Sequence, residues 1–213
     1  MRLWTIQGID IYNQLQREGI AYCTKPYFGD DEMFVDAYHW MAKQMRQRIG
    51  EPPVSGLEYP LWAWYQYDSI KKRQPPRSPH EMSEGLSAYM EIEIPDNQVL
   101  LSDYINWHNV LLKCALADGK RIEKMRDKLD NAAGRRLRFK ECPLTVQKEI
   151  EKSWEAVFDL DRRDQDVGLH HKRNRSIQAT FWVLRHENIV SVEFLECIGN
   201  QVKRKHTNQT ARL

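Results

Sequence analysis

The chain has 213 residues, of which 41% are hydrophobic and 29% charged, and its formal net charge is +2. This length suits one core of ordinary size, and seven Trp with nine Tyr exclude a disordered chain, because disordered segments are poor in aromatic residues. No apolar run reaches the roughly 18 residues that a membrane span needs, and the opening, MRLWTIQGIDIY, is too polar for a signal peptide. We therefore expect a soluble, cytoplasmic protein with no membrane partner.

The start of the chain predicts a compact unit of strand, helix and strand. Leu3–Ile6 is a short apolar strand, a helix runs from Asp10 to Gly19, and Ile20–Cys23 is a second strand. A glycine is the usual residue just after a helix end, where the backbone turns left-handed. The next helix is predicted over residues 32–49, where apolar residues recur at helical spacing (Phe34, Ala37, Met41, Met45 and Ile49).

The middle of the chain predicts three strands and a capped helix. Tyr59–Tyr67 alternates large aromatic side chains, which is typical of a half-buried strand, and Ala88–Ile94 alternates polar with apolar side chains. Val99–Leu101 is a third, shorter strand. Ser102 or Asp103 can cap the helix that follows, because both side chains accept hydrogen bonds from a first helical turn.

The last part of the chain predicts two helices and two strands. Residues 119–141 indicate a charged surface helix with a loop, and Pro143 begins an amphipathic helix whose inward residues are Val146, Ile150, Trp154 and Val157. Ile177–Leu184 and Val190–Cys197 are strand-like.

Together these elements predict the α+β class, with a short-stranded, mixed or antiparallel sheet core and flanking helices. We expect a single α+β domain over residues 1–199 and a basic, frayed C-terminal tail over residues 200–213. Residues 71–84 are rich in proline and predict a long loop.

We expect no metal, because the four cysteines form no C-x-x-C pair and no H-E-x-x-H motif is present. Cys114 on an apolar helical face and Cys197 in a strand suit reduced, buried thiols. His170 and His171 are adjacent, so in a strand they point to opposite faces and do not bind one metal together. Loops that cradle phosphates, such as G-x-x-x-x-G-K-[ST], are also absent from the sequence.

Three groups of side chains are candidates for a site. Trp62 and Trp64 share one face of the aromatic strand, and this face either stacks a base or nicotinamide or belongs to the core. Glu91 and Glu93 are about 7 Å apart on one strand face, where they suit acid–base work or form the solvated side of an edge-like strand. His108 lies beside the apolar face of its helix, which leaves it in a cleft or on the polar surface.

Charge is unevenly distributed along the chain. Residues 160–213 contain ten Lys/Arg against six Asp/Glu, an excess of +4 that leaves −2 for the remainder. A basic segment of this kind suits a nucleotide or nucleic-acid partner, and the alternative is ordinary solvated charge.

Three stretches resemble an uncharacterised bacterial family, a domain of unknown function. They are LWTIQGIDIYNQLQREGIAYC, AYMEIEIPDNQVLLSDYINWH and SIQATFWVLRHENIVSVEFL, and the likeness spans nearly the whole chain. This resemblance implies no activity.

The order of elements also resembles the ADP-ribosyltransferase fold, in particular the DNA-modifying ADP-ribosyltransferase toxins and their small relatives. Those proteins open with a strand that carries an NAD-contacting residue, continue with a helix and a glycine-containing turn, and carry a catalytic glutamate on a late strand. The resemblance covers about a third of the chain. It implies an ADP-ribosyltransferase-like fold with NAD as the cofactor.

By position, Thr5 or Gln7 falls where that fold places its nicotinamide- and ribose-binding residue, usually His or Arg. Gln178, or Thr180 two residues further on, falls where the glutamate would be. The resemblance therefore makes Thr5 and Gln178 the catalytic candidates. The cofactor cleft that it implies is lined by Gln7, Trp62, Trp64, Thr180 and His108.

An amide in place of the glutamate is a departure from the family pattern. It hydrogen-bonds but supplies no negative charge, and the loss of that charge costs of order 10² or more in rate. Either another carboxylate, such as Glu91, Glu93 or Glu187, has taken over the chemistry, or the site binds without catalysing. The structural alternative for Gln7, Gln178 and Thr180 is a hydrogen bond to neighbouring backbone.

Three functions stay open at this level. The first is an NAD-dependent ADP-ribosyltransferase-like protein, degenerate or active, that acts on nucleic acid or protein. The second is a non-catalytic nucleotide or nucleic-acid binding module, and the third is an interaction factor in bacterial stress or phage conflict. The first requires that the opening strand and the strand of Gln178 lie side by side, with Thr5, Gln7 and Gln178 around one pocket.

Overall fold

The computed structural model describes residues 1–25, 32–71, 85–117, 119–161, 175–198 and 201–205. The strands are β1 (Arg2–Gly8), β2 (Ile20–Tyr22), β3 (Leu61–Gln66), β4 (Gly85–Glu93), β5 (Leu100–Asp103), β6 (Ile177–Phe181), β7 (Val183–Arg185), β8 (Ile189–Ile198) and β9 (Gln201–Lys205). The helices are α1 (Ile9–Glu18), α2 (Glu32–Ile49), α3 (Tyr104–Leu111), α4 (Gly119–Ala133) and α5 (Leu144–Ser153).

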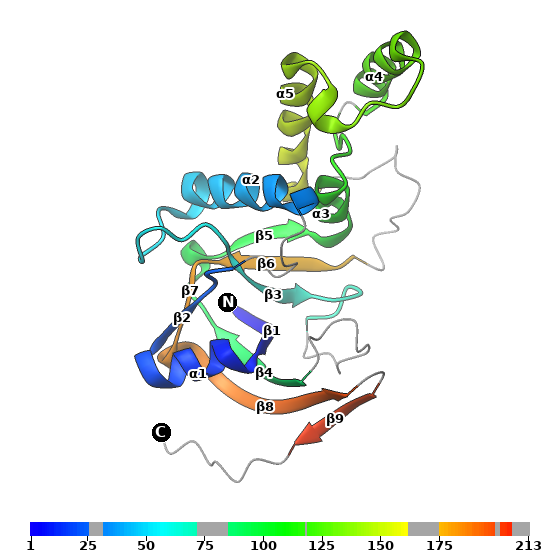
Figure 1. Ribbon diagram of the computed structural model, residues 1–213. Helices are drawn as coiled ribbons and strands as arrows, with labels where there is room; N and C mark the ends of the chain where they lie inside the picture. Colours follow the sequence, from blue (N-terminus) through cyan, green and yellow to red (C-terminus); the bar gives the residue numbers. More distant parts are fainter. Residues whose placement is uncertain (26–31, 72–84, 118, 162–174, 199–200, 206–213) are drawn as a thin grey trace.

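The strands form a seven-stranded antiparallel sheet in the order β5-β6-β3-β1-β4-β8-β9 and a two-stranded sheet of β2 and β7 (Figure 1). The predicted α+β class and the antiparallel sheet are confirmed. Three predictions lie outside the described residues: the loop over 72–84, the pair His170–His171, and the end of the tail. Within the described residues, none of the helices combines the length and apolarity needed to cross a bilayer.

The helices cover the sheet unequally. Helices α2 and α3 lie beside β5 and β6 (Figure 1), and Met41, Met45 and Trp107 are buried in one core cluster with Leu100 of β5. The other face of the sheet packs on α1 and the small sheet, where a second cluster contains Leu15, Ala21, Met90 and Phe181. The helical stripe predicted for residues 32–49 is confirmed, since Ala37, Met41 and Met45 are buried.

Helices α4 and α5 form an arm beyond α2 and α3 (Figure 1). Trp154, which follows α5, anchors the arm, because its Nε1 donates to the Cys114 carbonyl oxygen at 2.8 Å and its ring packs edge-on against Trp40. The four residues predicted to face inward in this segment are all buried. Cys114 itself is partly exposed and lies past the end of α3, so its predicted place on a helical face is wrong.

Two strand predictions near the C-terminus need correction. The single strand expected over Ile177–Leu184 is divided at Trp182 into β6, in the large sheet, and β7, in the small one. Trp182 donates a hydrogen bond from Nε1 to the Gly50 carbonyl oxygen at 3.0 Å and belongs to the α2–α3 cluster, whereas its neighbour Phe181 belongs to the other cluster. Residues 201–205 were expected in a frayed tail, but they form β9 and pair with β8.

Gly19 ends α1 in a left-handed conformation, as predicted, with φ of 71° and its N–H bonded to the Leu15 carbonyl. We expect Gly19→Ala to lower the free energy of unfolding by about 1 kcal/mol, because a Cβ strains this backbone even though no atom lies within 4 Å of it. Urea denaturation measures the change. The control is Gly119→Ala at the start of α4, where φ is not positive and the substitution should be neutral or stabilising. Equal effects at both positions would contradict the argument.

Candidate functional site

The large sheet is divided into two halves that meet between β1 and β3. Strand β1 pairs with β4 at seven positions, but with β3 only through Trp4 and Trp64. Beside this pair, side chains bond across to β3: Thr5 Oγ1 donates to the Trp62 carbonyl oxygen at 2.6 Å, and Gln7 Nε2 donates to the same oxygen at 3.3 Å. Thr5 and Gln7 therefore add side-chain hydrogen bonds to the single Trp4–Trp64 pairing between the two half-sheets.

A row of side chains crosses this junction on one face of the sheet. Trp4 of β1 lies opposite Trp64 of β3, Trp64 lies opposite Gln178 of β6, and Gln178 lies opposite Ser102 of β5. Directly paired residues in an antiparallel sheet share a face, with Cβ atoms about 5 Å apart. We call these four residues the Trp64 row.

Three members of the row carry buried polar atoms without a hydrogen-bond partner in the described structure. They are Trp4 Nε1, Gln178 Oε1 and Ser102 Oγ. Ser102 is completely buried and Trp4 is 7% exposed, whereas the remainder of Gln178 is partly exposed. Leaving such a group unpaired costs about 1–3 kcal/mol, so this concentration of unsatisfied donors and acceptors suits a site completed by a ligand.

Aromatic rings lie beside the row. The Trp64 ring is 4.9 Å from the Tyr104 ring and 5.0 Å from the Tyr67 ring, measured between centroids. His108, one turn along α3, is exposed, packs edge-on against Tyr104 and bonds the Tyr104 carbonyl through Nδ1 at 2.8 Å. The two rings beside Trp64 are therefore partly exposed, and His108 beside Tyr104 is exposed.

Asp103 fixes the position of α3 over the row. Its Oδ1 accepts the Asn106 N–H at 2.9 Å, which makes Asp103, and not the other candidate Ser102, the N-cap of α3. Its Oδ2 is 2.8 Å from Arg175 Nε. Both side chains of this ion pair are largely buried. Because Tyr104 begins α3, this cap and ion pair hold the Tyr104 ring against Trp64.

The structure separates the two catalytic candidates. Strand β3 lies between β1 and β6, so the expectation that the opening strand and the Gln178 strand are neighbours is wrong. Successive residues in a strand point to opposite faces, which places Thr5 and Gln7 on the face away from Gln178. Thr5 is also buried and bonded to backbone, so the shared pocket expected around Thr5, Gln7 and Gln178 is wrong too.

The other predicted residues divide between site and core. Trp62 shares the face of Trp64, but its ring packs on Trp107 at 5.1 Å within the α2–α3 cluster. Thr180 is completely buried, and its Oγ1 donates to the Leu100 carbonyl oxygen at 3.2 Å. Thr180 and Gln7 therefore hydrogen-bond to neighbouring backbone, as the non-functional interpretation of these residues expected. Gln178 Oε1, in contrast, has no hydrogen-bond partner among the described atoms.

The candidate carboxylates do not replace the missing glutamate beside Gln178. Glu91 lies opposite Trp4, so three strand spacings, about 14 Å, separate it from Gln178. Its Oε1 is 3.2 Å from Arg2 Nε. Strand β4 pairs with both β1 and β8, so the edge-like strand considered for Glu91 and Glu93 is wrong. Glu187 lies in the short turn between β7 and β8.

Sequence reasoning missed Trp4, Ser102 and Tyr104 as members of a site. Ser102 was considered only as a helix cap, and the pairing that brings Trp4 to Trp64 joins residues sixty positions apart in the chain. The aromatic content of Tyr59–Tyr67 was the available signal. Among the described residues, no group of three or more His, Cys, Asp or Glu side chains could hold a metal ion.

Comparison with known proteins gives the family of the chain. The family model "Domain of unknown function (DUF3841)" matches residues 2–190, most of the chain, and the chain belongs to this family. The resemblance to a family of unknown function over nearly the whole chain is thereby confirmed. No curated protein and no solved structure matches the chain.

Proposed function

We propose that this member of the DUF3841 family binds NAD at the Trp64 row, as an ADP-ribosyltransferase-like protein whose native site binds the cofactor without the usual catalytic glutamate. The observation that supports this proposal is the unpaired Oε1 of Gln178 beside the accessible Trp64 and Tyr104 rings. A ligand with a planar ring and an amide would satisfy both features at once.

The chemistry of nicotinamide matches these groups. Aromatic side chains hold planar rings by stacking, which contributes about 1–3 kcal/mol per base in nucleic-acid sites. The carboxamide nitrogen would donate to Gln178 Oε1, and the carboxamide oxygen would accept from Ser102 Oγ or Trp4 Nε1. Each of these protein atoms is buried and unpaired in the described structure.

Transfer of ADP-ribose breaks the bond between ribose C1′ and the nicotinamide nitrogen, and an acceptor oxygen or nitrogen bonds to C1′ while losing its proton. Positive charge develops on the ribose, and a neutral Gln178 amide does not stabilise it as a carboxylate would. Asp103, which lies opposite the neighbouring Ile177, is already bonded to Arg175 and to the Asn106 N–H. Cofactor binding is therefore the function that the arrangement supports best, with nucleic acid or protein as the acceptor class of any residual transfer.

Calorimetric titration of the whole chain with NAD tests the proposal. We expect binding of NAD and of nicotinamide mononucleotide, and we expect Gln178→Ala to weaken it by about tenfold, because one hydrogen bond in a desolvated site is lost. The matched control is Gln16→Ala, at an exposed position on α1. Absence of NAD binding, or equal affinity of the two variants, would end the proposal.

A further inference from the structure

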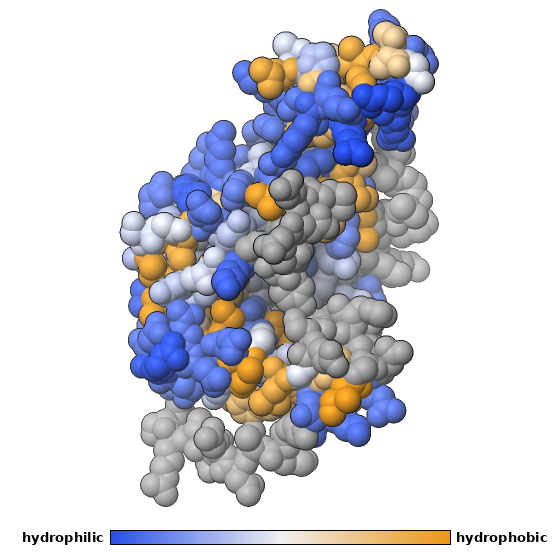
Figure 2. Space-filling view, viewed as in Figure 1, coloured by the Kyte–Doolittle hydropathy of each residue, from blue (hydrophilic) through white to orange (hydrophobic). Residues whose placement is uncertain are grey.

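A pocket lies at the other end of α3 from Tyr104. Its volume is about 850 Å³, and it is bordered by the end of α3, by α4 and by the segment between α4 and α5. Five cationic side chains line it: Lys113, Arg126, Arg136, Arg138 and Lys140. Figure 2 shows hydrophilic residues gathered around this arm of the molecule.

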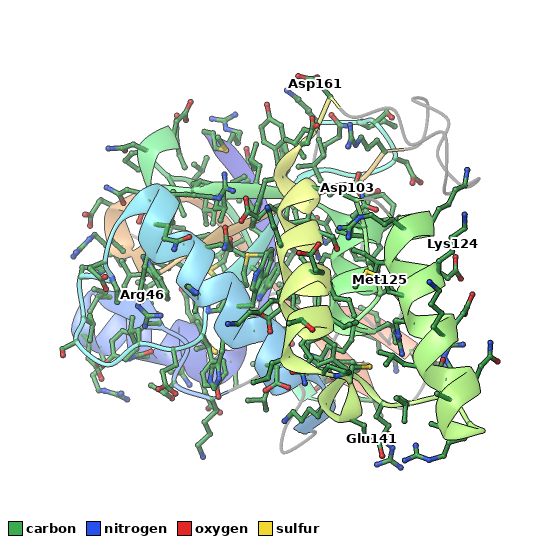
Figure 3. The ribbon with its side chains drawn as sticks, turned by 90° about the horizontal axis from the view of Figure 1, so that it is seen from above. Arg46, Asp103, Lys124, Met125, Glu141 and Asp161 are labelled. Carbon is green, nitrogen blue, oxygen red and sulfur yellow. The ribbon has the colours of Figure 1, made fainter. Side chains whose placement is uncertain are left out.

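The carboxylates of the pocket do not neutralise these cations. Asp36 and Glu141 are the acidic lining residues, which leaves five positive against two negative charges. Asp36 pairs with Lys140 at 3.2 Å, and Glu141 pairs with Arg135 and accepts the Arg138 N–H. Those bonds lower the pKa of Glu141 to about 2, so it stays charged and engaged. In Figure 3, Glu141 lies at the segment that joins α4 to α5.

Two of the cations carry buried atoms without a hydrogen-bond partner in the described structure, although Lys113 Nζ lies 5.7 Å from the centroid of the Trp154 ring. These atoms are Lys113 Nζ and Arg126 Nε. Burial lowers the pKa of Lys113, an effect that Asp36 opposes and Lys140 reinforces. Lys113 also has a left-handed backbone with φ of 58°, which is strained for a residue other than glycine. Arg126 is fixed, because its Nη2 donates to the Leu137 carbonyl oxygen at 3.0 Å.

The remaining walls of the pocket are apolar. Leu111, Leu137 and Phe139 line it, so the pocket joins a cationic region to a hydrophobic one. Its volume falls in the range of sites for small organic ligands, about 300–1,000 Å³. Guanidinium groups bind phosphate oxygens through paired hydrogen bonds, and an ammonium group adds a point charge.

We propose that this pocket binds a small phosphorylated ligand of nucleotide size, with the phosphate at Lys113 and Arg126 and the apolar or aromatic part against Leu137 and Phe139. Bound phosphate oxygens would supply the hydrogen bonds that Lys113 Nζ and Arg126 Nε lack. The site is distinct from the Trp64 row, because the length of α3, about 12 Å, separates them. The inference therefore does not depend on NAD binding.

The test is calorimetric titration of the whole chain with AMP, ATP, inorganic phosphate and a single-stranded oligonucleotide. We expect a nucleotide to bind more tightly than inorganic phosphate, and Lys113→Met to weaken nucleotide binding at least tenfold. Arg138→Gln, which removes another cation from the pocket lining, should weaken nucleotide binding as well. The matched control is Lys124→Met, on the outer side of α4 (Figure 3), which should bind as the native chain does. Arg138 is exposed, so its variant should keep the fold if Lys113→Met does not.

Three outcomes would overturn the proposal. One is no binding of any phosphate compound at low salt, and another is equal binding by the Lys113, Arg138 and Lys124 variants. The third is much tighter binding of the oligonucleotide with a steep dependence on salt, which would indicate a nucleic-acid surface. NAD titrated into Lys113→Met separates the two sites, since binding at the Trp64 row should persist.

Discussion

Replacement of Asp103 by alanine is expected to lower the free energy of unfolding by about 3–4 kcal/mol. The substitution leaves the largely buried Arg175 guanidinium without its charged partner, which costs about 3 kcal/mol or more for a buried pair. It also removes the cap of α3, at a cost of about 1 kcal/mol. The Arg175 bond to the Asp159 carbonyl oxygen, at 3.3 Å, offsets part of the loss. Urea denaturation at constant m-value measures the change.

Two further variants show whether the ion pair causes this effect. Asp127→Ala on α4 removes an exposed carboxylate and should change the free energy of unfolding by less than about 0.5 kcal/mol. Adding Arg175→Ala to Asp103→Ala should cost less than the sum of the single changes, because both remove the same contact. Strict additivity would show that the ion pair contributes nothing.

Gln178→Glu is expected to raise the rate of NAD hydrolysis by about 10²-fold, or about 2.7 kcal/mol of transition-state stabilisation. The new carboxylate would stand beside the ribose of an NAD whose nicotinamide is held at Trp64, and it would stabilise the positive charge as nicotinamide leaves. Only the ionised carboxyl acts in this way, so the rate should rise as pH rises through the pKa of the introduced carboxyl group. Release of nicotinamide is the measurement.

The expected increase in the rate of NAD hydrolysis should depend on the Trp64 row. Combining Gln178→Glu with Trp64→Ala should abolish it, because the ring that positions nicotinamide is lost, and Gln16→Glu on α1 should have no effect. Unchanged hydrolysis in Gln178→Glu that still binds NAD would show that the ribose lies away from this strand.

Local signals in the sequence predicted the elements well. The apolar stripe of residues 32–49 defined α2 at both ends, Gly19 defined the end of α1, and Asp103 was available as the cap of α3. Each of these features depends on residues within about one helical turn of one another. Such short-range patterns can be recognised from the amino-acid sequence without knowing the tertiary structure.

The site could not be predicted in the same way, because it depends on strand order. Nothing in the sequence shows that β3 lies between β1 and β6, or that the pairing register aligns Trp4 with Trp64 and Gln178 and so leaves Thr5 and Gln7 on the other face. Trp62 and Trp64 share one face of their strand, so alternation did not show which of the two tryptophans is accessible. The cationic pocket draws on three separate segments, although the run RRLRFK before α5 was a signal of concentrated positive charge.

The narrow junction between β1 and β3 has a mechanical consequence. Hydrogen bonds between strands resist bending of a sheet, and this line is crossed by one paired position, Trp4 with Trp64, and by the bonds of Thr5 and Gln7 to the Trp62 carbonyl oxygen. We therefore expect twisting motions of the large sheet to concentrate between β1 and β3. Trp4 lies in β1 and Trp64 in β3, so a ligand that contacts both rings would stiffen the sheet at this junction.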